Sequence, residues 1–190
     1  MQPHLWNLIT GAWVAVAMVW LAMAFTTKRA LKIQSPGSRF AQIAVLGLGA
    51  YLLFGGAGHS ETLTARFLPV SPAIAYLGCA LTLAGILFAV WARFFLGSNW
   101  SGTPMIKRDH ELIRSGPYSI VRHPIYSGFL LAVLGTVIYV GELRGLLAFG
   151  LAVIGLKWKS LIEESFMQEQ FGSRYFEYKR DVKALIPFVW

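Results

Sequence analysis

Residues 6–25 read WNLITGAWVAVAMVWLAMAF, and this stretch decides the class of protein. Its 20 residues contain no Asp, Glu, Lys or Arg. About 20 apolar residues in a helix span the roughly 30 Å hydrocarbon core of a bilayer. A signal peptide is the alternative, but its apolar core is usually about 7–15 residues long and follows a basic cluster. Here the basic residues come after the run, so we expect a membrane-spanning helix.

More runs with little or no charge follow along the chain, at residues 40–58, 70–96, 127–141 and 145–156. The last two are each too short to span a bilayer comfortably, and we expect them to form a tight pair of helices. The glycines at 47, 49, 55, 56 and 58 suit close helix packing in lipid. The sequence therefore predicts an all-α, polytopic membrane bundle of about five transmembrane helices with a cytoplasmic C-terminal helix.

The composition agrees with membrane insertion. Hydrophobic residues make up 56% of the chain and charged residues only 14%, against about 25% charged residues in soluble domains. The single cysteine, Cys79, excludes an intramolecular disulfide and a multi-cysteine metal site. We predict no metal site.

The basic residues predict the orientation. With five spans, 15 of the 17 Lys and Arg residues gather on one side of the membrane, and the other side holds only Arg66 and Arg144. The basic side should be cytoplasmic, which places the amino terminus outside. This topology, with attraction to anionic lipids, explains the net charge of +8 without a nucleic-acid partner. We expect the inner or plasma membrane of a prokaryote.

Polar residues concentrate in the second half of the chain. We therefore divide it into an N-terminal transmembrane part, residues 1–96, and a more polar part, residues 97–190. Residues 157–182 have a charged, helical pattern that is broken around Gly172, and such a segment suits the membrane surface or a position over a site.

The densest polar motif is GPYSIVRHPIYSG at residues 116–128, which runs directly into an apolar helix. Pro124 suits a first helical turn, where its missing N–H is not needed. The free backbone N–H groups of that turn favour an anionic partner. With Arg122, His123 and two tyrosines around it, this helix start predicts a polar ligand site. Simple anchoring in the headgroup region is the alternative.

Glu163 and Glu164 form a second candidate binding site, a few residues beyond the last apolar run. Two adjacent carboxylates close to anionic lipid need a local positive partner. A bound amino group or sulfonium would supply one, and salt bridges to nearby Lys or Arg are the alternative.

Residues 122–128, RHPIYSG, resemble the RHPxYxG motif of the isoprenylcysteine carboxyl methyltransferase family and its phospholipid methyltransferase relatives. The same family pattern is matched, in the same order, by Leu96–Trp100 upstream and by Glu163-Glu164, Phe171–Tyr178 and Ile186–Phe188 downstream. The resemblance covers about residues 91–190, and it implies that residues 97–190 form a catalytic, cofactor-binding part with a helical hairpin and a C-terminal helix.

The resemblance implies a cytoplasm-facing pocket for S-adenosylmethionine, capped by the C-terminal helix, and a tunnel that opens to lipid. The implied cofactor-binding residues are Tyr118, His123, Pro124, Tyr126, Gly128, Glu163 and Glu164. Arg122, with Asn99 or a lysine such as Lys159, would orient the acceptor. Family members often carry Arg just before the Glu pair, where this chain has Lys157 and Lys159. The charge is kept but bidentate pairing with a carboxylate is lost.

The expected function is methyl transfer to the carboxylate of an isoprenylcysteine-like acceptor that enters from the bilayer. Such a carboxylate is ionised at neutral pH and needs no general base. Phospholipid amines and small thiols are alternative acceptors, and an amine would need a base such as His123 or a glutamate. A small transporter would bury ionisable residues within several spans, and a lipid-binding adaptor would leave the ordered motifs unexplained.

Overall fold

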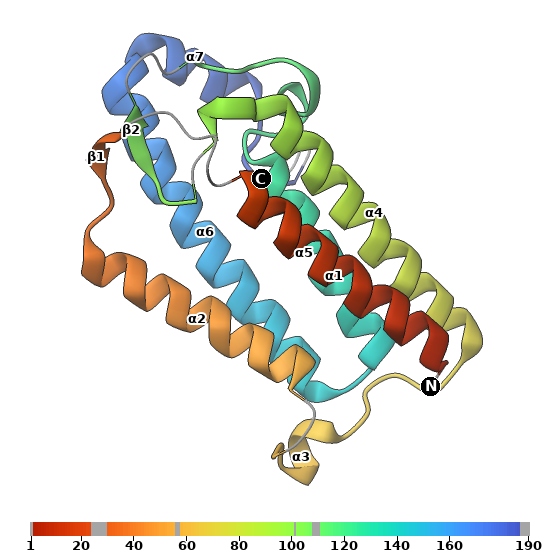
Figure 1. The fold of residues 1–190 in the computed structure, drawn as a ribbon. Coiled ribbons are helices and arrows are strands. Elements are labelled where there is room, and N and C mark those ends of the chain that lie inside the picture. Colours follow the sequence, from red (N-terminus) through yellow and green to blue (C-terminus); the bar gives the residue numbers. More distant parts are fainter. Residues whose placement is uncertain (1, 24–29, 56–57, 101, 108–110, 187–190) are drawn as a thin grey trace.

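A computed structural model describes residues 2–23, 30–55, 58–100, 102–107 and 111–186. The elements are α1 (Pro3–Met23), β1 (Ala30–Ile33), α2 (Pro36–Phe54), α3 (Glu61–Thr64), α4 (Pro72–Leu96), η2 (Gly97–Asn99), β2 (Met105–Lys107), η3 (Gly116–Ser119), α5 (Pro124–Val140), α6 (Leu143–Phe171) and α7 (Ser173–Asp181). The long helices lie side by side as a bundle, and α7 crosses one end of it (Figure 1).

Four helices, α1, α2, α4 and α6, are long and apolar enough to cross a membrane. The fifth apolar helix, α5, has 17 residues and falls just below that length. The predicted all-α membrane bundle is confirmed, and the chain is an integral membrane protein. Prolines begin α2, α4 and α5, where a missing N–H costs no helical hydrogen bond.

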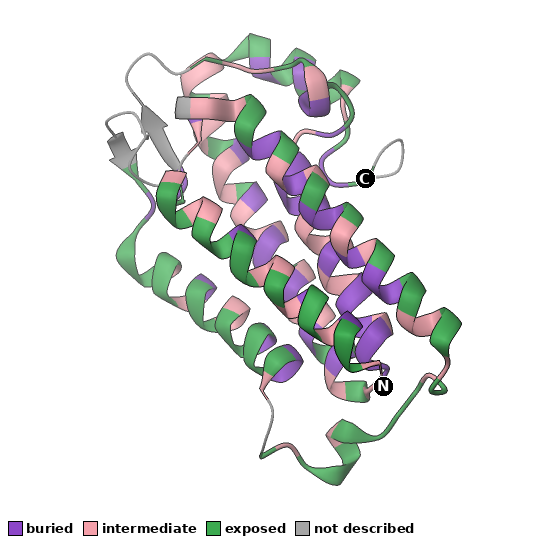
Figure 2. Cartoon of the chain, turned by 45° about the vertical axis from the view of Figure 1, so that its right-hand side comes forward, coloured by how far each residue is buried: buried purple, intermediate pink, exposed green. Residues whose placement is uncertain are grey.

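The closest packing joins α4 to α5, whose backbones touch at glycines. A Cβ atom on Gly85 of α4 would lie 2.4 Å from the Ala132 nitrogen, and one on Gly135 of α5 would lie 2.4 Å from the Thr82 nitrogen. Small residues permit this close approach. Helices in lipid associate through such packing, because the hydrophobic effect does not drive them together there. Buried residues concentrate on α5 and the facing side of α4, whereas α2 exposes much of its surface (Figure 2).

The prediction for the glycines at 47–58 was only partly right. Gly49 contacts Ala148 on α6, but Gly47 has no atom of another element within 4 Å of its expected Cβ position. A glycine on a lipid-facing side of a helix has the same sequence signature as one at a contact.

The second helix of the predicted pair is longer than expected. We predicted that the apolar run ends near Leu156 and that a charged helix follows, but α6 continues without a break to Phe171. No proline intervenes, and the Lys, Leu, Glu, Gln and Met residues that follow favour helix. The 29 residues of α6 measure about 43 Å along the axis, more than a bilayer core. Its last turns therefore extend past the apolar layer. The predicted break at Gly172 is confirmed, with φ at +53°.

Two short strands were not predicted. β1 and β2 pair antiparallel, with Ile33 opposite Met105. They connect the residues after α1 to those after α4, at the end of the bundle that carries α7 (Figure 1). We call this end the site end.

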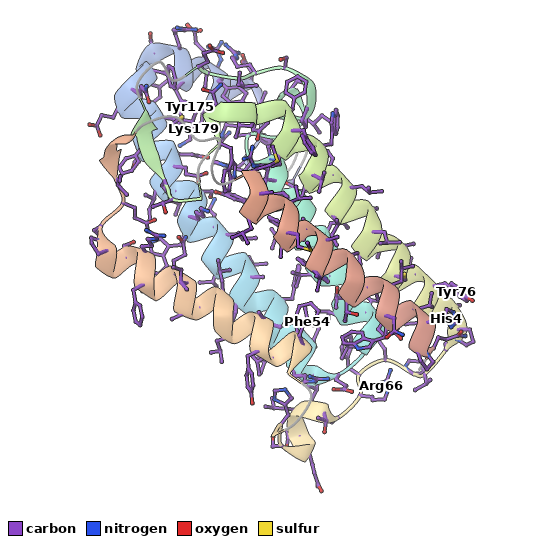
Figure 3. All side chains as sticks on the ribbon, viewed as in Figure 1. His4, Phe54, Arg66, Tyr76, Tyr175 and Lys179 are labelled. Atoms are coloured by element: carbon purple, nitrogen blue, oxygen red, sulfur yellow. The ribbon has the colours of Figure 1, made fainter. Side chains whose placement is uncertain are left out.

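Two basic residues that the sequence assigns to opposite sides of the membrane lie at opposite ends of the bundle. Arg66 lies far from α7, whereas Tyr175 and Lys179 lie at the site end (Figure 3). Near Arg66, Arg144 pairs with Glu142 at 2.6 Å, and its Nη1 also donates to the carbonyls of Leu52 and Gly55. The division of the chain into two parts at residue 96 stays a prediction. α4 lies before this point and α5 after it, and these two helices form the most extensive helix contact described.

Candidate functional site

The site forms where the loop before α5 meets the end of α6. His123 precedes the first turn of α5 with φ −123° and ψ 61°, and Pro124 is the first helical residue. The backbone nitrogens of Arg122 and His123 donate to the carbonyl oxygens of Lys183 and Ala184, at 2.8 and 3.0 Å. The C-terminal segment, residues 182–186, is thereby held against this helix start.

Arg122 connects three parts of the site. Its Nε and Nη2 donate to Oε1 of Glu164, at 3.2 and 2.7 Å. Its Nη1 donates to the carbonyl oxygens of Lys179, at 3.2 Å, and of Val182. Only 7% of the Arg122 side chain is exposed. The guanidinium group thus joins α6 to α7 and to the C-terminal segment.

His123 and Tyr126 face the two glutamates as a stacked pair. Their rings are 5.4 Å apart and tilted by only 6°. The Tyr126 hydroxyl donates to Oε1 of Glu163 at 2.5 Å. The imidazole directs Nε2 toward Glu164 Oε1 at 3.2 Å and Nδ1 toward Glu163 Oε2 at 3.6 Å. Both ring nitrogens therefore face carboxylates.

The two glutamates have different surroundings. Successive helical residues point about 100° apart, so Glu163 and Glu164 cannot face the same way. The Glu164 side chain is 7% exposed and contacts Arg122, His123 and Lys179, the last at 2.9 Å. The Glu163 side chain is 23% exposed and contacts Tyr126 and His123. Glu163 is the one that faces open space.

The charge of His123 follows from this arrangement. Burial lowers the pKa of His123, but the hydrogen bonds and charges of Glu163 and Glu164 outweigh burial and raise the pKa above its usual value. The surroundings therefore favour the protonated imidazolium, with both N–H groups directed at carboxylates.

A first cavity opens beside this cluster. The space between its lining atoms is about 820 Å³, including its opening to solvent. Its lining includes one carboxylate of the pair, Glu163, together with the polar side chain of Asn99. Aromatic rings form much of the rest, namely Trp100, Tyr118, Tyr126, Phe166, Tyr175 and Tyr178. We call it the polar cavity.

A second, larger cavity lies between α1, α2, α5 and α6, and its lining is mostly apolar. Its volume is about 1120 Å³, including its open side. α1 lies mainly against α4 and α2 mainly against α6, so the cavity occupies the space between these two helix pairs. Trp100, Ile125 and Tyr126 line both cavities. We call the second one the apolar cavity.

The predicted acceptor-orienting residues lie at different places. Lys159 lines the apolar cavity, where its Nζ donates to the Gly102 carbonyl at 2.9 Å and lies 5.5 Å from the Tyr126 ring centre. Asn99 lines the polar cavity, and its Oδ1 accepts from the Glu111 backbone nitrogen at 3.4 Å. Arg122 borders the polar cavity but directs its nitrogens at Glu164 and backbone carbonyls.

The predicted cofactor-binding residues are only partly brought together. Tyr118, His123, Tyr126 and Glu163 line the polar cavity. The others do not line it, namely Pro124, Gly128 and Glu164. Gly128 lies against α4 instead, where an added Cβ would be 2.6 Å from the Gly85 oxygen. Its smallness serves helix packing.

Sequence reasoning missed several residues. Lys179 was counted only as a basic residue, but it binds Glu164. Trp13 and Trp20 line the apolar cavity, although in an uncharged run they look like any lipid-facing aromatic residue. The Phe171–Tyr178 part of the family pattern did carry a signal, because Tyr175 and Tyr178 line the polar cavity. The end of the Ile186–Phe188 motif lies outside the described residues.

Known proteins resemble this chain over more than half of its length. A family model described as phospholipid methyltransferase matches residues 73–174. Protein-S-isoprenylcysteine O-methyltransferase B of Arabidopsis thaliana is 30% identical over 123 residues, which are 61% of this chain and 60% of that protein. The Saccharomyces cerevisiae protein-S-isoprenylcysteine O-methyltransferase is 33% identical over 120 residues, 60% of this chain and 48% of that one. The chain thus spans about half to three fifths of the length of these relatives.

A solved structure titled as the eukaryotic intramembrane Ras methyltransferase, isoprenylcysteine carboxyl methyltransferase, overlaps all of this chain and 54% of its own. The TM-score is 0.42 and the identity 22%. The resemblance drawn from the RHPIYSG motif is confirmed by the family match and by the names of these relatives. Because the family match covers more than half of the sequence, including both glutamates, the chain belongs to the phospholipid methyltransferase family.

Proposed function

We propose that this protein is a membrane methyltransferase that uses S-adenosylmethionine and methylates the carboxylate of an isoprenylcysteine-like, lipophilic acceptor. One observation carries the proposal. A polar cavity with a carboxylate and an apolar cavity between membrane helices share Trp100, Ile125 and Tyr126 in their linings. Two reactants of opposite character can approach each other there. The relatives named as protein-S-isoprenylcysteine O-methyltransferases support the choice of acceptor.

The polar cavity suits the cofactor. When bound, S-adenosylmethionine supplies a methyl group on a sulfonium sulfur, and the reaction exchanges that carbon–sulfur bond for a carbon–oxygen bond at the acceptor carboxylate. Glu163 is the exposed carboxylate for a cationic amino group. The rings of Tyr118, Tyr126 and Tyr175 line this cavity, and aromatic rings suit the binding of a cation.

Arg122 and Glu164 support the site without contacting the reactants. Their nitrogens and oxygens are committed to each other, to Lys179 and to backbone carbonyls. We therefore assign Arg122 to holding α6, α7 and the C-terminal segment in position. This leaves Lys159 and Asn99 to orient the acceptor. Lys159 is the cation at the apolar cavity, and its charge suits an acceptor carboxylate.

A carboxylate acceptor fits the state of His123. The acceptor is ionised at neutral pH, so its methylation releases no proton. A phospholipid amine would need a base, but both nitrogens of His123 already face carboxylates. Catalysis on a carboxylate requires only alignment of the reactants and exclusion of water. Among the alternatives, this geometry favours the ester over the amine product.

We further propose that the site end faces the cytoplasm. Lys179 lies at this end and Arg66 at the other (Figure 3). Arg122 donates to the Lys179 carbonyl and Arg174 belongs to α7, so both also lie at the site end. Basic residues of membrane proteins favour the cytoplasmic side. The acceptor would then reach the apolar cavity from the bilayer, and the cofactor would come from the cytoplasm.

Calorimetry of cofactor binding tests the proposal. The purified protein in lipid nanodiscs should bind S-adenosylmethionine or S-adenosylhomocysteine. The Glu163→Gln variant should bind at least tenfold more weakly. Glu169→Gln is the matched control, since this glutamate is exposed on the same helix. Absence of binding by the intact protein contradicts the proposal, and unchanged affinity in Glu163→Gln contradicts the site.

A further inference from the structure

One end of the apolar cavity is lined by two aromatic rings. Trp13 of α1 and Phe54 of α2 both line it, and their rings meet edge to face with centres 5.8 Å apart. Behind them, the Trp6 ring lies 6.2 Å from Phe54 and is stacked on Tyr139 at 5.7 Å. Aromatic side chains thus continue from α1 through α2 to α5 beyond the cavity. Phe54 lies at the end of α2 that is far from Tyr175 (Figure 3).

Trp13 is held in this position by a hydrogen bond inside the bundle. Its indole N–H donates to Thr136 Oγ1 on α5 at 3.1 Å. Thr136 is fully buried, and its hydroxyl also bonds to the Ala132 carbonyl at 2.9 Å and lies 3.2 Å from the Thr82 hydroxyl. A polar group in an apolar layer keeps its few partners, because lipid offers none. The indole therefore has a fixed orientation, unlike a tryptophan that faces lipid.

The other end of the cavity is cationic. Lys159 lines it with its Nζ 5.5 Å from the ring centre of Tyr126, which also lines the polar cavity. Along α6, the lining residues from Lys159 to Ala148 advance about 16 Å at 1.5 Å per residue. Along α5, Ile125 to Val133 advance about 12 Å on the same basis. An occupant with an anionic head at Lys159 thus has about 12–16 Å for its tail.

We propose that the Trp13–Phe54 pair limits the length of the acceptor's apolar tail. This inference rests on the proposed function, which supplies the acceptor. An extended chain advances about 1.2 Å per bond, as the extended polypeptide backbone does. The cavity accommodates a straight tail of about 10–13 bonds on this scale. A longer tail must bend and leave sideways between α1 and α2.

The length dependence should take the form of a plateau followed by a fall. A tail entering from the bilayer leaves surroundings as apolar as the cavity, so each added carbon contributes little affinity. The fit of the tail end against the Trp13 and Phe54 rings then decides how the reaction rate depends on tail length. Acceptors up to the limit should react alike, and longer ones should react several-fold more slowly.

A photolabelling experiment tests the limit directly and does not depend on methyl transfer. The full-length protein in nanodiscs is exposed to N-acetyl-S-alkylcysteines that carry a diazirine at the tail end, with tails of about 8, 12, 16 and 20 carbons. The 12-carbon probe should label Trp13 and Phe54. The 20-carbon probe should label lipid or lipid-facing residues such as Val14, which is 59% exposed. Labelling that is independent of tail length overturns the proposal.

Turnover of the same acceptors is measured for the wild type, Trp13→Ala and the milder Phe54→Leu. Either substitution should raise the rate with 16-carbon tails at least threefold relative to 12-carbon tails. Val14→Ala, next to Trp13 on the lipid-facing side, is the matched control and should keep the wild-type profile. Labelling of Trp13 and Phe54 without any methyl transfer would contradict the proposed function and leave the length limit standing. Methyl transfer that depends on tail length in the same way in the wild type and in all variants would support the proposed function and contradict the length limit.

Discussion

Arg122 donates two hydrogen bonds to one carboxylate oxygen of Glu164, from Nε at 3.2 Å and from Nη2 at 2.7 Å. Both side chains are 7% exposed. Lys179 of α7 reaches the other oxygen of the same carboxylate at 2.9 Å. One buried carboxylate therefore joins the start of α5, the end of α6 and the helix beside the polar cavity.

Glu164→Gln should destabilise the protein. The substitution leaves Arg122 buried without its negative partner, and breaking a buried ion pair costs about 3–5 kcal/mol. We expect a clear fall in the thermal unfolding temperature in detergent and faster proteolysis of the segment after Gly172. Glu177→Gln, exposed on α7, is the control and should change neither. A Glu164→Gln variant of full stability would show that this network does not hold the C-terminal segment.

Glu163→Gln should weaken cofactor binding more than it destabilises the protein, whereas Glu164→Gln should mainly destabilise it. Glu163 is more exposed than Glu164 and has fewer positive neighbours. Its loss should reduce cofactor affinity at least tenfold and lower the unfolding temperature less than Glu164→Gln does. Calorimetry and thermal unfolding of the two variants, measured side by side, test this division. If both variants lose affinity and stability equally, the two glutamates act as one unit.

The stability of the protein should depend on pH through His123. Its pKa is raised in the folded protein by Glu163 and Glu164, in spite of burial. A raised pKa contributes stability that is full below the unfolded value of about 6.5. That contribution is lost as the pH rises through the higher folded value. The unfolding temperature should therefore fall more steeply above pH 6.5 in the wild type than in His123→Asn. Parallel curves for the two proteins would contradict this account of the imidazole.

Gly85→Ala should disrupt the contact between α4 and α5. The new Cβ would lie 2.4 Å from the Ala132 nitrogen and 2.5 Å from the Gly128 oxygen, and neither backbone atom can move aside. Overpacking of this kind costs about 1–3 kcal/mol. Gly150→Ala is the control, because nothing lies within 4 Å of its Cβ position and alanine favours helix by about 1 kcal/mol. Unfolding temperatures of the two variants should move in opposite directions. A tolerated Gly85→Ala would mean that α4 and α5 pack less closely than described.

The sequence predicted the membrane helices well, because a long apolar run without charge is stable as a helix that crosses the lipid bilayer. It did not show that the apolar run and the charged segment after it form one helix, α6. The change from apolar to charged residues near Leu156 marks a change of surroundings, but helix formation depends on backbone preference and continues to Phe171. The conformational break at Gly172 was predictable, since a positive φ favours glycine.

Within the site, residue types were easier to predict than their partners. The RHPIYSG motif and the glutamate pair indicated a polar site, and four of the seven implied cofactor-binding residues line the polar cavity. The pairing of Arg122 with Glu164 joins positions 42 residues apart, and no local pattern encodes such a contact. For Gly128, the sequence suggested the wrong partner. Its place in the motif suggested a ligand contact, but only the packed structure reveals α4 against it.

Transfer of a radiolabelled methyl group from S-adenosylmethionine to N-acetyl-S-farnesylcysteine tests the central claim most directly. The protein in nanodiscs, with phosphatidylethanolamine present as a competing acceptor, should place label on the farnesylcysteine, and mild base should release it as expected for an ester. Glu163→Gln should lose at least nine tenths of this activity, and Glu169→Gln should keep it. Absence of labelled product, or base-stable label on the phospholipid amine alone, would contradict the claim.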